Sequence, residues 1–249
     1  MNIKVSIGYS SIWGRWKNNI KTKLYLGHCS ITQYSKDKQK FINNYVDTKY
    51  HKKTKYNKFI AFGDSLHITL AKFNVIKNPL DKTLETLTQF LEEGWQSIGY
   101  ETKEEESRYF TKGLNILKRY HEDAKDKSRK ILLVEEMITK ELGNNTVIFG
   151  KVDKVFINEL GQLEVLDYKS SDYVNYVLNP MDDSQLSLYL ILVKHRLGYY
   201  PKVISYYYLS KNIKISYIVK IEDIAHLEKH FADTIYNIQN DFFSLTQTS

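Results

Sequence analysis

The sequence contains few residues that link chains covalently or interrupt regular structure. Its 249 residues include one cysteine, Cys29, with three prolines and eleven glycines. A single cysteine excludes an intrachain disulfide and any metal site built from several thiolates, and a reducing compartment is expected. Since no low-complexity linker or repeat of fixed period is present, we expect residues 1–249 to form one elaborated domain.

Long apolar runs are also absent. The first residues, Met1–Val5, lack the apolar core of a signal peptide, and no run approaches the roughly 20 residues that cross a bilayer. The sequence therefore predicts a soluble, cytoplasmic protein that has no membrane partner.

Acidic residues are outnumbered, and the positive charge is concentrated. The formal net charge is +7, and residues 36–58 hold eight lysines and two aspartates. Aromatic side chains are interleaved with these lysines, namely Phe41, Tyr45, Tyr50, Tyr56 and Phe59. Lysines displace counterions from phosphates and aromatic rings stack on bases, so the segment suits nucleic-acid binding. A solvated lysine-rich segment without a partner is the alternative interpretation.

Hydrophobic periodicity divides the chain into a mainly helical part, residues 1–130, and an α/β part, residues 131–249. Helices are expected near residues 12–16 and over 64–73, 81–98, 104–125, 181–197 and 222–242. Strands are expected over residues 131–138, 146–157, 163–170, 202–209 and 213–220. The pattern predicts a mixed β-sheet flanked by helices on both faces, an α/β/α sandwich with an N-terminal helical elaboration.

A predicted hairpin brings two aspartates together. Residues 158–162 resemble a three-residue loop with its flanking pair, in which Gly161 takes the left-handed conformation. Pairing the two ends of this loop places Asp153 directly opposite Asp167, with Cβ atoms about 5 Å apart. Strand alternation returns Lys169 to the same face. Adjacent carboxylates repel each other unless a proton or cation lies between them, so a divalent metal ion is expected there.

Four short motifs occur in order along the chain. They are Gly63-Asp64-Ser65-Leu66-His67, Gly150-Lys151-Val152-Asp153, Asp167-Tyr168-Lys169-Ser170 and Gln185-Leu186-Ser187-Leu188-Tyr189. In combination they resemble the motifs of the RecB-like branch of the PD-(D/E)XK nuclease superfamily. The resemblance implies a restriction-endonuclease-like fold with residues 131–249 as the catalytic core. It also implies a metal-dependent DNA nuclease, expected to be an exonuclease, that acts in DNA repair, recombination or processing.

The resemblance also implies roles for individual residues. His67, Asp153 and Asp167 would bind Mg²⁺ or Mn²⁺ together with the backbone carbonyl of Tyr168. Lys169 would orient or help to deprotonate the attacking water and offset charge on the phosphate. These assignments place the metal between the two paired aspartates of the hairpin.

A helix would support this site from the side. Gln185 and Tyr189 stand one turn apart on one helical face, and by the resemblance they would steady the lysine or the DNA backbone as further catalytic residues. Glu135 and Glu136 follow an apolar run that leads toward the site, and either is a further candidate. The sequence does not choose between these two glutamates.

Two departures from the family pattern stand out. Many relatives hold an iron–sulfur cluster with cysteines on both sides of the domain, but here only Cys29 could correspond and residues 243–249 contain none. No iron–sulfur cluster is therefore expected. Val152 replaces the proline of the family name and leaves the carboxylate in place.

The expected partner is DNA, either single-stranded or with single-stranded ends, and a helicase or repair complex is a possible protein partner. An alternative is a nuclease-fold DNA-binding or assembly module with weak or no activity. The intact set of Asp153, Asp167 and Lys169 argues against this alternative. Action on RNA is not excluded by any residue.

Overall fold

The structure is a computed structural model that describes residues 23–46, 56–174 and 183–246. The helix expected near residues 12–16 and part of the lysine-rich segment lie outside these residues. The helices are α2 (His28–Lys36), α3 (Lys38–Phe41), α4 (Lys58–Asn74), α5 (Leu84–Gly94), α6 (Lys103–Glu122), α7 (Ser184–Leu197) and α8 (Ile221–Thr246), with a π-helical turn at Ile42–Val46 and a 3-10 turn at Pro79–Asp81. The strands are β1 (Leu24–Leu26), β2 (Ser128–Leu142), β3 (Thr146–Asn158), β4 (Leu163–Lys169), β5 (Val203–Tyr208) and β6 (Ile213–Ile218).

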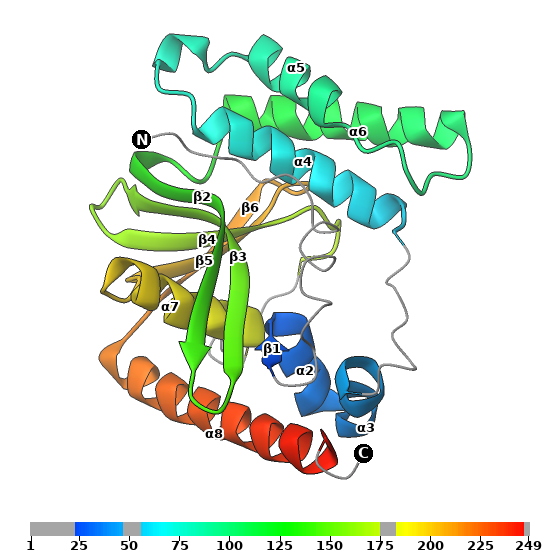
Figure 1. Ribbon diagram of the computed structural model, residues 1–249. Helices are drawn as coiled ribbons and strands as arrows, with labels where there is room; N and C mark the ends of the chain where they lie inside the picture. Colours follow the sequence, from blue (N-terminus) through cyan, green and yellow to red (C-terminus); the bar gives the residue numbers. More distant parts are fainter. Residues whose placement is uncertain (1–22, 47–55, 175–182, 247–249) are drawn as a thin grey trace.

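These elements form a mixed sheet between two layers of helices, as predicted (Figure 1). The strand order is β1-β3-β4-β5-β6, with β2 paired to β3. Helices α4, α5 and α6 cover one face, and α7 and α8 lie on the other (Figure 1). Within the described residues, no helix is long and apolar enough to cross a membrane.

Strand β3 organises the sheet because it pairs with three other strands. Antiparallel β2 runs along one edge of β3, from Leu142–Thr146 to Ser128–Asn158. On the other edge, β1 pairs with residues 146–148 and β4 with residues 154–157. Residues 149–153 therefore have no strand beside them on this edge, within the described chain. This interruption, which we call the β3 gap, lies between two paired segments of one strand.

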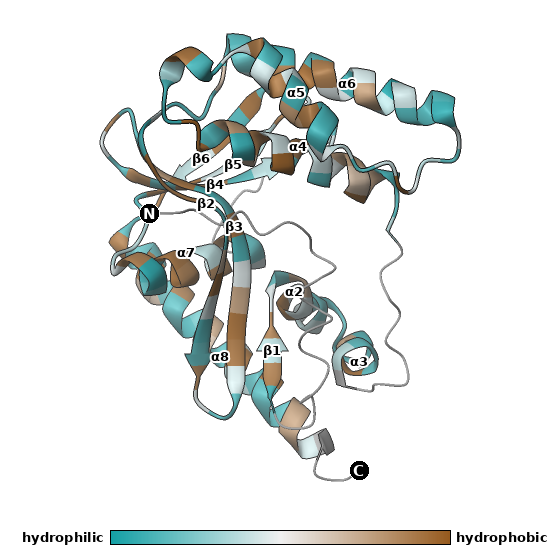
Figure 2. Cartoon of the chain, turned by 45° about the horizontal axis from the view of Figure 1, so that its top comes forward, coloured by the Kyte–Doolittle hydropathy of each residue, from teal (hydrophilic) through white to brown (hydrophobic). Residues whose placement is uncertain are grey.

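Burial on both faces explains the apolar sequences of the central strands. The core under α4, α5 and α6 includes Leu66, Leu70, Leu117 and Leu166, all at most 1 % exposed. The core under α7 and α8 includes Leu190, Val152, Val165 and Ile238. Hydrophobic residues accordingly occupy much of β3 (brown in Figure 2). A strand covered on both sides carries near-continuous apolar residues rather than a strict alternation.

The helix α7 packs closely against the β3 gap at a glycine. A Cβ atom on Gly150 would lie 2.9 Å from Leu192 Cδ1 and 3.4 Å from Tyr189 Cε1. A side chain at this position would force Leu192 to shift. Gly150 therefore allows α7 to pack closely against β3.

Some expected boundaries differ from the observed ones. α5 ends at Gly94 rather than near residue 98, because the backbone becomes extended at Trp95, with ψ of 129°, and Ile98 is 61 % exposed instead of joining the apolar stripe. The division between residues 130 and 131 falls inside β2, which starts at Ser128. The part expected to be mainly helical also supplies β1 to the sheet. The extents of β1 and β2 are determined by their pairing with β3, a long-range contact that local periodicity does not predict.

Candidate functional site

The helix α4 carries His67 to the sheet. Its start is fixed by Asn57, whose side chain accepts hydrogen bonds from the backbone amides of Phe59 and Ile60. One turn before His67, a Cβ atom on Gly63 would lie 3.2 Å from Ser170 Oγ. A bulkier residue would therefore press against the segment that follows β4. The small residue keeps α4 close to the carboxyl end of that strand.

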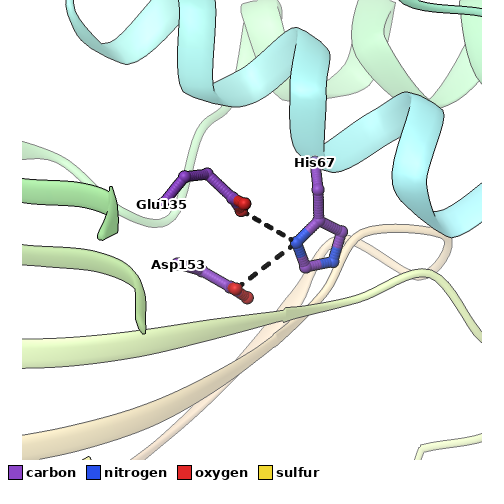
Figure 3. Close-up of side chains that lie close together, drawn as sticks. All are labelled: His67, Glu135 and Asp153. Atoms are coloured by element: carbon purple, nitrogen blue, oxygen red, sulfur yellow. Dashed lines mark hydrogen bonds and ion pairs between the residues drawn. The ribbon is translucent and has the colours of Figure 1, made fainter. Parts of the chain in front are cut away.

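His67 is surrounded by oxygen atoms. Its Nδ1 lies 3.2 Å from Glu135 Oε1 and 3.4 Å from Asp153 Oδ1, as the two carboxylates converge on one ring nitrogen (Figure 3). Its Nε2 lies 3.0 Å from the backbone carbonyl oxygen of Tyr168. One ligand atom from each of His67, Glu135 and Asp153 falls within 4.8 Å of the others. The three side chains come from α4, β2 and β3.

Glu135 reaches this cluster from a strained position in β2. The ladder passes from Val134–Lys154 to Glu136–Val152, so Glu135 stands opposite Asp153 without joining a ladder pair. Its φ of 48° is rare for a residue with a side chain and costs on the order of 1–3 kcal/mol. Such strain is frequent where a side chain is held in place for a function.

The choice between the two glutamates follows from this geometry. Glu135 is buried in the cluster, whereas Glu136 Oε1 accepts a hydrogen bond from Arg196 Nε at 2.6 Å on the protein surface. The loop Gly143–Asn145 signals a second hairpin, whose register pairs Glu135 with Asp153. That loop is the sequence signal that would have selected Glu135.

The aspartates follow the predicted register as far as the ladder extends. β3 and β4 pair from Ile157–Leu163 to Lys154–Leu166. At the next step, the backbone amide of Tyr168 donates to Asp153 Oδ2 at 2.8 Å. The strands separate where the two carboxylates begin, and this separation opens the β3 gap toward the cluster.

Asp167 has a different partner on each oxygen. Its Oδ1 accepts a hydrogen bond from Gln185 Nε2 at 2.5 Å, and the Tyr189 hydroxyl oxygen lies 3.4 Å from it. Lys169 Nζ lies 2.7 Å from Oδ2 and forms an ion pair with it. Burial and the charge of Asp153 raise the pKa of Asp167 to about 6.

The helix α7 joins these groups to the backbone of β3. Its first turn is capped by Asp183, which accepts from the amides of Gln185 and Leu186. Gln185 Oε1 accepts from Lys169 Nζ at 2.9 Å, and the Tyr189 hydroxyl donates to the carbonyl oxygen of Lys151 at 2.7 Å. That carbonyl lies in the β3 gap. Gln185 and Tyr189 thus lie on the inner face expected from their spacing.

The charges of the cluster shift one another. Burial disfavours the charged imidazole of His67, but Asp153 and Glu135 outweigh it and raise its pKa well above the usual value. Burial of Glu135 is likewise outweighed by His67 and by Lys151, and the pKa of Glu135 is lowered. Lys151 forms an ion pair with Glu135 and was not among the expected site residues. These buried acids raise the pKa of His67 and pair with Lys151, so the cluster is suited to bind a cation.

A divalent cation fits this donor set. Carboxylate oxygens, a backbone carbonyl and an imidazole nitrogen converge here, whereas Asp167, an expected ligand, lies outside this group and its Oδ2 pairs with Lys169. Oxygen-rich sites of this kind suit Mg²⁺ and Mn²⁺, and the imidazole is also compatible with Mn²⁺. The residues that would hold a metal are thus already brought together by the fold.

Comparisons with known proteins agree with the fold. Residues 30–249 match the family profile of the PD-(D/E)XK nuclease superfamily. The crystal structure of a candidate exonuclease from Eubacterium rectale superposes with a TM-score of 0.52 and 12 % identity, covering 96 % of this chain and 88 % of that one. A crystal structure of a protein designated SSO0001 aligns over 84 % of each chain at 14 % identity, but its TM-score of 0.29 is too low to indicate a shared fold. No protein of curated function matches the chain significantly.

Proposed function

Because the chain belongs to the PD-(D/E)XK nuclease superfamily, we propose that it is a deoxyribonuclease that uses Mg²⁺ or Mn²⁺ to hydrolyse phosphodiester bonds with water. The observation that carries this proposal is the convergence of His67, Glu135 and Asp153, whose ligand atoms lie within 4.8 Å of one another. Buried acids this close repel each other unless a proton or a cation lies between them. Carboxylate oxygens favour a divalent metal ion as that cation.

The proposed metal ligands are His67, Asp153, Asp167 and the backbone carbonyl of Tyr168, with Glu135 beside them. A divalent cation bound there would neutralise phosphate oxygens and lower the pKa of the attacking water. Support comes from the short distances that already join His67 to Glu135, Asp153 and the Tyr168 carbonyl.

Lys169 is proposed to orient the attacking water and to offset the negative charge that develops on the phosphate. Gln185 would keep the Lys169 ammonium beside Asp167, since its amide bonds to both groups. Tyr189 would hold Gln185 in turn, because its hydroxyl accepts from Gln185 Nε2 at 3.1 Å and donates to the Lys151 carbonyl. A chain of hydrogen bonds then fixes the lysine without touching the substrate.

We further propose that the protein acts as an exonuclease on DNA that is single-stranded or has single-stranded ends. The four ordered motifs favour the RecB-like branch and a role in DNA repair, recombination or processing, with a helicase or repair complex as a partner. The net charge of +7 supports a polyanionic substrate but does not distinguish DNA from RNA.

The test is cleavage of labelled single-stranded DNA, double-stranded DNA and RNA with Mg²⁺ or Mn²⁺. Asp153→Ala and Lys169→Ala should each lose about 10³-fold in rate, because each removes charge placed for the transition state. Glu159→Ala and Lys229→Ala, at exposed positions away from the cluster, are the matched controls.

Equal cleavage by the wild type and the two site variants would contradict the proposal. DNA retention in a gel shift without cleavage under any metal would instead support the DNA-binding or assembly module. Preferential cleavage of RNA would keep the hydrolytic site and change the substrate.

A further inference from the structure

A cavity of about 250 Å³ opens beside Lys169. Its lining comes from the end of β4, the start of α7 and β5, namely Lys169, Ser171, Tyr173, Asp183, Gln185, Tyr206 and Tyr208. Two of these residues, Lys169 and Gln185, belong to the network around Asp167. The cavity therefore adjoins the proposed cleavage site directly and shares its lysine.

Tyr173 is the exposed member of this lining. Its side chain is 76 % exposed, whereas Tyr206 and Tyr208 are 6 % and 3 % exposed. Tyr206 is already covered by Lys169 Nζ, which lies 4.7 Å from its ring centroid. Among the described residues, the ring of Tyr173 contacts no other aromatic ring and its hydroxyl makes no hydrogen bond. A large aromatic ring left free beside a catalytic lysine is available to a ligand.

The segment that carries Tyr173 is held by one internal hydrogen bond and by two bonds to other parts of the chain. Ser171 Oγ donates to the carbonyl oxygen of Tyr173 at 2.8 Å, and the carbonyl of Ser171 accepts from Ser210 Oγ at 2.6 Å. Asp172 Oδ2 accepts from Lys112 Nζ of α6 at 2.6 Å. The last two bonds connect the segment to the turn after β5 and to α6. The backbone under the free ring is therefore fixed beside the cavity.

Size and charge identify the occupant. The cavity is just below the ~300–1,000 Å³ that holds a drug-sized ligand, so it admits one nucleoside and not a base pair. A phosphate beside Lys169 would place the attached sugar and base toward the cavity. Asp183 in the wall disfavours a second phosphate there but accepts hydrogen bonds from a neutral sugar or base.

We propose that this cavity is a nucleoside subsite, in which one unpaired nucleoside next to the cleaved bond stacks its base on Tyr173. The proposal rests on the proposed nuclease function and adds the form of its substrate. Because the subsite takes one base away from its partner, the strand must be single at the cleaved bond. Stacking on an aromatic ring tolerates every base, so no sequence preference is expected.

Fluorescence of 2-aminopurine tests the subsite without cleavage. The base analogue is placed at successive positions of a short single-stranded DNA, and binding is measured in low salt with EDTA. The wild type should quench the analogue at one position, Tyr173→Phe should retain the quenching, and Tyr173→Ala should lose it. Tyr236→Ala is the matched control, since Tyr236 is an exposed tyrosine of α8, 61 % accessible.

Cleavage kinetics give a second measurement. Tyr173→Ala should raise KM for single-stranded DNA about tenfold, as expected for the loss of one stacked base, with kcat kept within about twofold. An abasic nucleotide at the quenched position should raise KM of the wild type by a similar factor and should not raise that of Tyr173→Ala further. Thermal unfolding of both Tyr173 variants should match the wild type, because the ring is exposed.

These experiments distinguish failure of the nucleoside subsite from failure of the nuclease function. If the wild type cleaves DNA and Tyr173→Ala binds, quenches and cleaves like it, the subsite is wrong and the nuclease function stands. If quenching depends on Tyr173 but no divalent metal supports cleavage, the subsite stands and the nuclease function is wrong. Quenching at no position of the strand would also overturn the subsite.

Discussion

Two buried clusters of charge lie beside each other along β3 and β4, and they differ in how their charges are balanced. On the face covered by α4, α5 and α6, Asp126 accepts from Lys154 Nζ at 2.7 Å and from the hydroxyls of Tyr120 and Tyr168. Asp126 and Lys154 are each only 2 % exposed. Each charge has its partner, so we call this the closed cluster.

The second group, which we call the open cluster, consists of His67, Glu135, Asp153, Asp167 and Lys169. It lies next to the closed cluster, since Asp153 precedes Lys154, but it draws on both helical layers, with His67 from α4 and Gln185 of α7 beside Asp167. Here three buried acids lie together, and two of them converge on one imidazole. Burial of a single paired acid, as in the closed cluster, does not indicate function. Several buried acids that converge on one point do indicate it.

The largest expected difference between the closed and the open cluster is in their contribution to the free energy of unfolding. Asp126→Asn should lower the free energy of unfolding by about 3 kcal/mol, because it leaves the ammonium of Lys154 buried without its counter-charge. Asp153→Asn should lower that free energy by less, since relief of repulsion between two acids offsets the loss of the charge that faces His67. Denaturant unfolding of both variants measures the contrast.

A second substitution makes this contrast specific. Lys154→Met in the Asp126→Asn background should recover most of the lost stability, because the uncompensated charge is removed while the amide still accepts from the two tyrosines. Equal destabilisation by Asp126→Asn and Asp153→Asn would remove the distinction between the closed and open clusters.

Divalent metal should stabilise only through the open cluster. Mn²⁺ at 100 times its dissociation constant should add about 2.7 kcal/mol to the free energy of unfolding of the wild type. Asp126→Asn should gain the same increment from a lower starting point, whereas Asp153→Ala should gain little. A metal-induced rise in Tm that is equal in Asp153→Ala and the wild type would place the metal elsewhere.

The smallest expected effect separates the two adjacent glutamates. Glu135→Gln should weaken Mn²⁺ binding by about 10–100-fold, the range found for groups that support a metal site. Glu136→Gln is the matched control and should leave it unchanged, because Glu136 pairs with Arg196 on the surface. Isothermal titration with Mn²⁺ measures both. A greater loss in Glu136→Gln would contradict the role given to Glu135.

Local patterns were sufficient for much of the site. The loop 158–162 determined the register of β3 and β4, and the spacing of Gln185 and Tyr189 determined their common face on α7. Both depend on residues close in sequence. They also follow fixed periods of strand and helix, so they could be predicted before any tertiary contact was known.

The closed cluster could not be predicted in this way. A lysine in an apolar strand suggests an exposed position, but Lys154 is buried because Asp126 lies in the loop before β2, with Tyr120 and Tyr168 completing the set. These partners are distant along the chain. The contact of Lys151 with Glu135 was missed for another reason, because the loop Gly143–Asn145 that sets the pairing of β2 with β3 was not recognised as a hairpin.

The β3 gap has a consequence for self-association. A long unpaired strand edge is a template on which another chain can add a strand. Here β1 and β4 occupy the ends of that edge, and the space between them is covered by α7, whose Leu192 and Tyr189 lie over Gly150. The backbone carbonyl of Lys151 is likewise occupied by the Tyr189 hydroxyl. This edge of β3 is thus interrupted near the site without presenting a continuous template to another chain.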